Sequence, residues 1–112
     1  RYDFVFYAVA DGQGIANLVF YLVEKKGKIS VLRDGERLKA VSDKDGRVLF
    51  EAIPGGRYVA NPEQQTDFPK VSGFVRLLHD QHFTLKSRGA RVKRIGKQHH
   101  RDYIIDRGRH AK

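Results

Sequence analysis

The chain has 112 residues, of which 40% are hydrophobic and none is cysteine, and its formal net charge is +9. This length suits one domain with its own hydrophobic core. The lack of cysteine excludes disulfides and thiolate metal sites, and no run of about 18 apolar residues is present to form a membrane-spanning helix. Because the chain starts at Arg1 and contains no methionine, we expect it to be a piece of a longer protein.

The first part of the chain alternates strand-forming segments with turn signals. Tyr2–Ala10 is apolar on both faces and predicts a strand in the interior of a sheet. Ile15–Glu24 is also apolar on both faces, and its aromatic and β-branched content favours a buried strand over a buried helix. Ile29–Leu32 and Arg37–Val41 are predicted to pair as a hairpin around the Asp34-Gly35 turn.

The stretch from Ser42 to Tyr58 has the clearest structural pattern. Asp45-Gly46 predicts a tight turn, because glycine reaches positive φ without a Cβ clash. The strand Arg47–Ile53 alternates, and the face expected to be buried carries Val48, Phe50 and Ala52. Pro54-Gly55-Gly56 ends that strand. The return strand Arg57–Ala60 then places Tyr58 on the core.

Further strand candidates follow a loop over Asn61–Asp67, and they are Val71–Leu78, His82–Ser87, Arg91–Ile95 and Asp102–Asp106. No segment shows a sustained helical period. The sequence therefore predicts an all-β fold, an antiparallel β-sandwich of about seven strands. We expect residues 1–85 to form the sandwich body and residues 86–112 to form a basic C-terminal segment that packs partly on the same domain.

Positive charge is concentrated at the C-terminal end. Residues 1–85 hold 12 Lys and Arg against 11 Asp and Glu, whereas residues 86–112 hold 10 against 2. This asymmetry favours an acidic partner protein or a neighbouring domain of the same assembly, to which arginines bind carboxylates in bidentate geometry. The candidate partner-binding residues are Lys86, Arg88, Arg91, Lys93, Arg94, Lys97 and Arg101.

The same basic segment leaves a nucleic-acid partner as the alternative. Seven cations could neutralise phosphates without reading the base sequence. Tyr103 is the only aromatic residue in the segment, so stacking on single-stranded bases has little support. A solvated, unstructured terminus would explain the same charge run.

Motifs that could carry chemistry are weak. Asp43-Lys44-Asp45-Gly46 begins like a calcium loop, but Arg47 and Pro54 occupy ligand positions of the EF-hand pattern, so a turn is expected. His79 and His82 would converge only across a turn at Asp80-Gln81, and a surface turn is commoner than a metal site. No serine has a Gly-x-Ser-x-Gly context. We therefore expect no enzyme activity, no catalytic residue, no metal and no cofactor.

Three motifs together resemble the bacterial transthyretin-like β-sandwich, a group that includes the carboxypeptidase-regulatory-like and collagen-adhesin B-type modules. They are Val9-Ala10-Asp11-Gly12-Gln13-Gly14-Ile15-Ala16-Asn17, Ser42-Asp43-Lys44-Asp45-Gly46-Arg47-Val48-Leu49-Phe50 and Ile53-Pro54-Gly55-Gly56-Arg57-Tyr58. The resemblance covers about residues 4 to 60. It implies a transthyretin-like sandwich that presents or docks other domains.

The resemblance also implies a setting. The first motif is similar to modules attached to type VI secretion spike and effector proteins, where the module is an adaptor for cargo. A secreted, cell-surface, secretion-system or phage-like location is therefore expected. Collagen-adhesin relatives often carry a Lys–Asn or Lys–Asp isopeptide bond, but Lys25, Lys26 and Lys28 lie in a predicted loop, so we expect no such cross-link.

Overall fold

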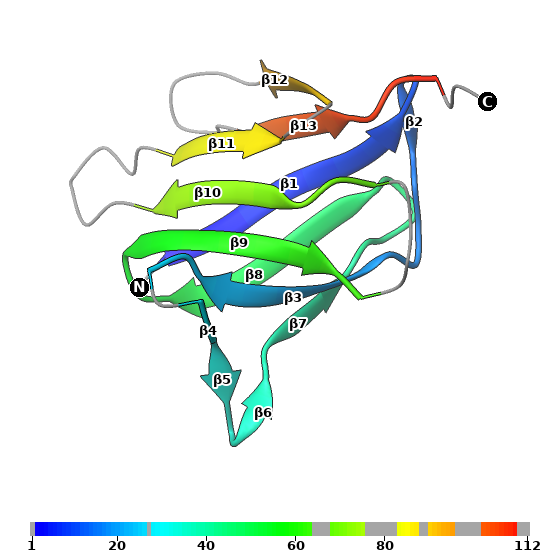
Figure 1. Ribbon diagram of the computed structural model, residues 1–112. Helices are drawn as coiled ribbons and strands as arrows, with labels where there is room; N and C mark the ends of the chain where they lie inside the picture. The colour runs from blue at the N-terminus through cyan, green and yellow to red at the C-terminus, as the bar shows by residue number, and fades with distance from the viewer. Residues whose placement is uncertain are drawn as a thin grey trace.

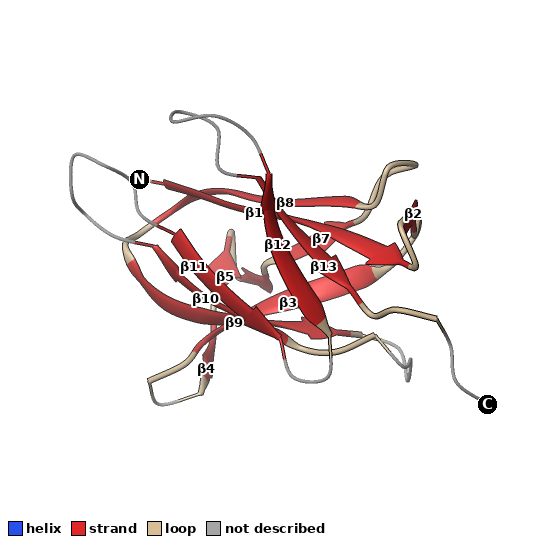
Figure 2. Ribbon diagram, turned by 90° about the horizontal axis from the view of Figure 1, so that it is seen from above, coloured by secondary structure: helices blue, strands red, loops and turns tan. Residues whose placement is uncertain are grey.

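The computed structural model describes residues 2–26, 28–63, 68–75, 83–87, 90–95 and 102–109, and all regular structure within them is β-strand (Figures 1 and 2). Two main sheets pack as a sandwich, and nearly all strand pairs are antiparallel. The predicted all-β sandwich is thus confirmed. The described segments include no helix of the length and hydropathy that a membrane crossing requires.

The first sheet, called sheet A, is built around the N-terminal strand. Its order is β12 (Arg91–Ile95), β13 (Asp102–Asp106), β1 (Tyr2–Ala10) and β2 (Gln13–Gly14), with β8 (Arg47–Ile53) also paired to β1. β1 is interior, as its two apolar faces predict. β13 pairs with β1 in parallel, with Tyr7 opposite Ile104, whereas β8, β2 and β12 join by antiparallel pairs. A strand from the C-terminal segment therefore lies inside sheet A.

The second sheet, called sheet B, is built around the second long apolar strand. Its order is β11 (Phe83–Ser87), β10 (Val71–Val75), β9 (Gly56–Pro62), β3 (Val19–Glu24) and β4 (Ile29–Ser30), and β7 (Lys39–Val41) also pairs with β3. β3 is interior, as predicted. β9 continues through Asn61 and Pro62, which pair with Tyr21 and Phe20, so the loop predicted from Asn61 begins two residues later.

A short hairpin projects from the sandwich (Figure 1). It consists of β5 (Leu32–Arg33) and β6 (Glu36–Arg37), joined by Asp34 and Gly35 with φ of 55° and 81°. Both turn residues have positive φ, which matches the twist of a two-residue hairpin. The predicted pairing of Ile29–Leu32 with Arg37–Val41 holds for Leu32 with Arg37 and for Val31, whose carbonyl accepts the Leu38 N–H at 2.8 Å, whereas β4 and β7 pair with β3.

Aromatic rings from both sheets fill the core. Phe4 packs edge-to-face against Phe6 and Phe50, with ring centroids 5.9 and 6.0 Å apart, and Phe6 packs against Phe20 at 5.2 Å. Such edge-to-face pairs add stability beyond burial of their area. Tyr58 is buried as predicted, and its hydroxyl donates a hydrogen bond to the Pro54 carbonyl at 2.7 Å. This contact fixes the reversal between β8 and β9.

One predicted orientation in β8 is wrong. Ala52 is exposed and has φ of 54°, and Ile53 is buried in its place. The register shifts here, because the three steps along β8 from Phe50 to Ile53 lie opposite only two steps along β1, from Phe4 to Tyr2. This β-bulge turns Ala52 outward. The Ala52 N–H donates to the Asp3 carboxylate at 3.0 Å. The Arg33 side chain of β5 donates to the Glu51 and Ala52 carbonyls at 2.6 and 3.3 Å.

Candidate protein interface

The predicted basic residues that the structure describes lie on two strands. Lys86 is in β11, and β12 carries Arg91, Lys93 and Arg94. In the register of sheet A, Lys93 lies opposite Ile104 and Arg94 opposite Tyr103, while Lys86 lies opposite Ser72 in sheet B. The Arg91 side chain is exposed. Arg88, Lys97 and Arg101 lie outside the described residues.

These two strands end their respective sheets and lie close to each other (Figure 1). Within the described residues, β11 pairs only with β10, and β12 pairs only with β13. The structure thus brings the described part of the basic segment to one side of the sandwich. Basic residues on edge strands have two physical roles, because they discourage unwanted strand pairing and also attract acidic surfaces.

The outer face of sheet B is more apolar than a solvated face usually is. Along β3, Phe20 and Leu22 point into the core, and Val19, Tyr21 and Val23 lie half-buried on the other side. Val41 lies opposite Val19 and is 48% exposed, and Val59 lies opposite Val23. Antiparallel sheets with one solvated face normally alternate apolar and polar residues. We call these five residues, Val19, Tyr21, Val23, Val41 and Val59, the apolar row.

Charged residues flank the apolar row. Lys39 lies opposite Tyr21, and the Arg37 guanidinium stacks 3.8 Å above the Tyr21 ring, an arrangement in which the cation is attracted to the ring face. The Tyr21 hydroxyl donates to the Glu63 carboxylate, and this hydrogen bond raises the pKa of Tyr21. The ring is therefore held between a cation and a carboxylate.

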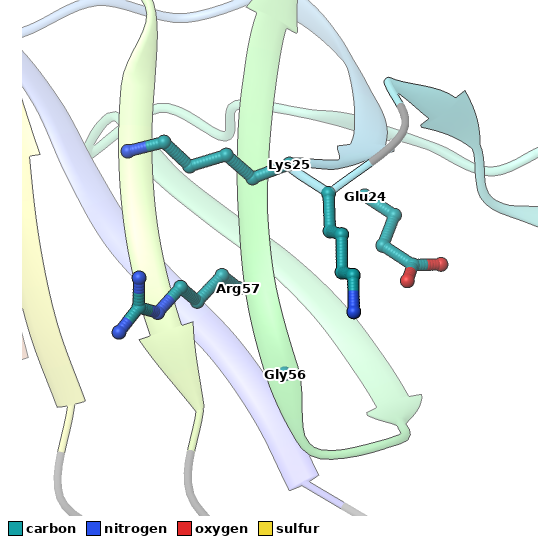
Figure 3. A pocket seen from close by; sticks show the side chains of 5 residues that line it. Glu24, Lys25, Gly56 and Arg57 are labelled. Atoms are coloured by element: carbon teal, nitrogen blue, oxygen red, sulfur yellow. The ribbon is translucent and has the colours of Figure 1, made fainter.

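A hollow of about 430 Å³ lies at the end of β3 and the start of β9. It is lined by Glu24, Lys25, Lys26, Gly56 and Arg57, and the Lys25 N–H donates to the Arg57 carbonyl at 2.9 Å, which joins its two sides. Figure 3 shows the Lys25 and Arg57 side chains extending in the same direction, away from the Glu24 carboxylate. We call this feature the cationic hollow.

Sequence reasoning missed this convergence. The sequence predicts a loop for Lys25, Lys26 and Lys28, and the structure places Lys25 and Lys26 at the turn after β3. Arg57 follows the Pro54-Gly55-Gly56 reversal, more than thirty residues later in the chain. The one available signal was the predicted antiparallel return of the strand that carries Arg57, but nothing local showed that it would pair with β3.

At the opposite end of β3, polar side chains hold backbone segments together. Ser42 is buried, and its hydroxyl donates to the Ile15 carbonyl at 2.6 Å and accepts the Leu18 N–H at 2.9 Å. Asp43 accepts the N–H groups of Asp45 and Arg47, each at 2.9 Å. The hydrogen bond from the Arg47 N–H contributes most to holding the pKa of Asp43 below its usual value, and the bond from Asp45 adds to this effect. The predicted turn at Asp43–Gly46 is thus present.

Asp106 joins the end of β13 to the turn after β1 at this same end of the sandwich. Its carboxylate accepts N–H groups from Asp11 at 2.8 Å, Gly12 at 3.1 Å and Gly108 at 2.7 Å. Burial acts to raise the pKa of Asp106, but the three N–H donors and the nearby Arg91 charge lower it. The carboxylate therefore serves as a clamp between β13 and the turn after β1.

The metal hypothesis falls outside the part of the chain with described structure. His79 and His82 are not among the described residues. Within the described residues, no three His, Asp or Glu side chains lie close enough together to hold a metal ion.

Comparisons with known proteins add little to this picture. No protein-family model and no curated protein matches the chain. Among solved structures, a variant of BcpA, the major pilin subunit of Bacillus cereus, superposes with a TM-score of 0.49 and 19% sequence identity. That match covers 77% of this chain and 26% of the pilin subunit.

Proposed function

We propose that this chain is a non-catalytic docking module that binds an acidic protein partner or an acidic neighbouring domain of the same assembly. The observation that carries the proposal is the outer face of sheet B, where the apolar row lies beside Lys39, Arg37 and the cationic hollow. Interfaces combine an apolar centre with a charged surround that favours complementary partners. The exposed Arg91 lies on β12, which together with β11 carries the other predicted basic residues whose strands are described.

Three polar side chains among the described residues support a structural role. The Ser42 hydroxyl and the Asp43 and Asp106 carboxylates are each bonded to backbone groups, so they serve the fold rather than a reaction. Together with the resemblance of the sequence to presenting modules, this favours a component of a larger exported or phage-like bacterial assembly.

The proposal is tested with peptides as probes. A peptide of alternating Glu and Phe should bind the full chain at least about tenfold more tightly than hexaglutamate, because it supplies both apolar and acidic contacts. Val41→Glu should abolish that advantage. The matched control is Leu32→Glu in the hairpin, which also changes an exposed apolar residue, 61% accessible, and should leave binding unchanged.

Isothermal titration calorimetry across salt concentrations provides the measurement, with a short DNA duplex as the competing ligand. Docking on an acidic protein is contradicted if the duplex binds more tightly than both peptides with a steep salt dependence. It is also contradicted if Val41→Glu and Leu32→Glu weaken peptide binding equally.

A further inference from the structure

The cationic hollow has the composition of a binding site for an acidic group, an inference that rests on the proposed docking function. Three cationic side chains from two separate segments surround it, and Glu24 is the single acidic residue in its lining. Within the described residues, neither Lys25 nor Lys26 forms an ion pair. The lining therefore holds more positive than negative side chains.

The backbone holds this arrangement in place. The Lys25 N–H bond to the Arg57 carbonyl fixes the turn after β3 against the first residues of β9, and Glu24 lies opposite Tyr58 in the adjacent pair. Gly56 also lines the hollow and has φ of 157°, and a Cβ added there would lie 3.6 Å from the Tyr58 ring. The cations thus surround a preformed space on two anchored strands, which lowers the entropic cost of binding.

The ligand chemistry follows from the donors. Arg57 offers a planar guanidinium that suits a carboxylate in bidentate geometry, and Lys25 and Lys26 add ammonium donors. Val59, two residues along β9 from Arg57, belongs to the apolar row. We infer that the cationic hollow is a carboxylate-binding subsite, which receives an Asp or Glu side chain of the partner while the apolar row packs against its neighbouring residues.

Amide NMR of the full chain, titrated with hexaglutamate, tests this inference. The amide signals of Lys25, Lys26, Gly56 and Arg57 should shift in a saturable way, and the double variant Lys25→Gln/Arg57→Gln should bind about tenfold more weakly. The matched control is Lys44→Gln, which removes an exposed lysine at the other end of β8 and should change affinity little. Inorganic phosphate provides the comparison ligand.

Three results would overturn the subsite. In the first, only the amide signals of other residues shift. In the second, the double variant and Lys44→Gln lose equal affinity for hexaglutamate. In the third, phosphate binds more tightly than hexaglutamate at these amides. The two proposals fail separately. If Val41→Glu weakens the Glu-Phe peptide while the double variant does not, docking stands and the subsite is wrong. If the hollow amides shift but Val41→Glu has no effect, the subsite stands and the docking face is wrong.

Discussion

The two ends of the sandwich use polar residues in opposite ways. At the end near Ser42, hydroxyl and carboxylate oxygens are bonded to backbone N–H and carbonyl groups, and backbone segments touch closely. At the end near Arg57, the cationic side chains of Lys25, Lys26 and Arg57 line the cationic hollow instead. The difference separates side chains that hold backbone segments together from cationic side chains that line a hollow, and the predictions below test that separation.

The largest effect is expected at Gly46. It has φ of 84°, and an added Cβ would lie 2.2 Å from the Ala8 carbonyl oxygen. The Ala8 N–H donates to the Gly46 carbonyl at 2.8 Å, which holds the turn close to β1. Gly46→Ala should lower the free energy of unfolding by about 3 kcal/mol or more, or prevent folding. Gly12→Ala is the matched control, because Gly12 has φ of 83° but open space around it.

Urea unfolding would measure both glycine variants. Gly12→Ala should cost about 1 kcal/mol, which reports the backbone conformation without the clash. Equal costs for the two substitutions would show that the close contact between the turn and β1 does not limit stability.

A smaller loss is expected from Ser42→Ala. This change leaves the Leu18 N–H and the Ile15 carbonyl without their bonds to the buried hydroxyl, and it should cost about 1–3 kcal/mol. Ser30→Ala, at a half-buried position in β4, should stay within about 0.5 kcal/mol of the parent chain in thermal and urea unfolding. If Ser42→Ala costs as little as Ser30→Ala, the hydrogen bonds of the Ser42 hydroxyl do not stabilise the fold.

The Asp106 clamp gives a pH-dependent effect. The folded-state pKa of Asp106 is lowered. The carboxylate therefore stabilises the folded state fully above the usual pKa of about 3.8, and this stabilisation is lost as pH falls through the folded-state pKa. Asp106→Asn should cost about 1 kcal/mol at pH 7. The difference from the parent chain should shrink towards pH 3, measured by urea unfolding at several pH values, with Asp45→Asn as control. A difference independent of pH would contradict the clamp.

The smallest effect on stability is expected at the other end. Lys25→Gln and Arg57→Gln replace exposed cations, so each should change the free energy of unfolding by less than about 0.5 kcal/mol. Melting temperatures measured beside the binding titrations would check this. A large loss of stability would mean that these side chains maintain the fold, and the comparison between the two ends would fail.

Much of the fold follows from local patterns. β8, β12 and β13 begin and end at their predicted residues, because alternation and turn residues act over a few positions. Ala52 was misplaced because the bulge depends on Asp3 and Arg33, which are far away in sequence. For the site, the predicted basic residues with described positions lie on β11 and β12, but the apolar row was not recognised. Its residues become neighbours only when β7 and β9 pair with β3.

The sequence by itself determined the long strands β1, β8, β12 and β13, the turns at Asp34-Gly35 and Asp43–Gly46, and the uneven charge, because each depends on neighbours in the chain. Tertiary structure decided the parallel pairing of β13 with β1 and the convergence of Lys25 and Lys26 with Arg57. These features depend on which distant strands pair and in which register. That choice depends on how well the whole core packs, and no short segment of the sequence contains this information.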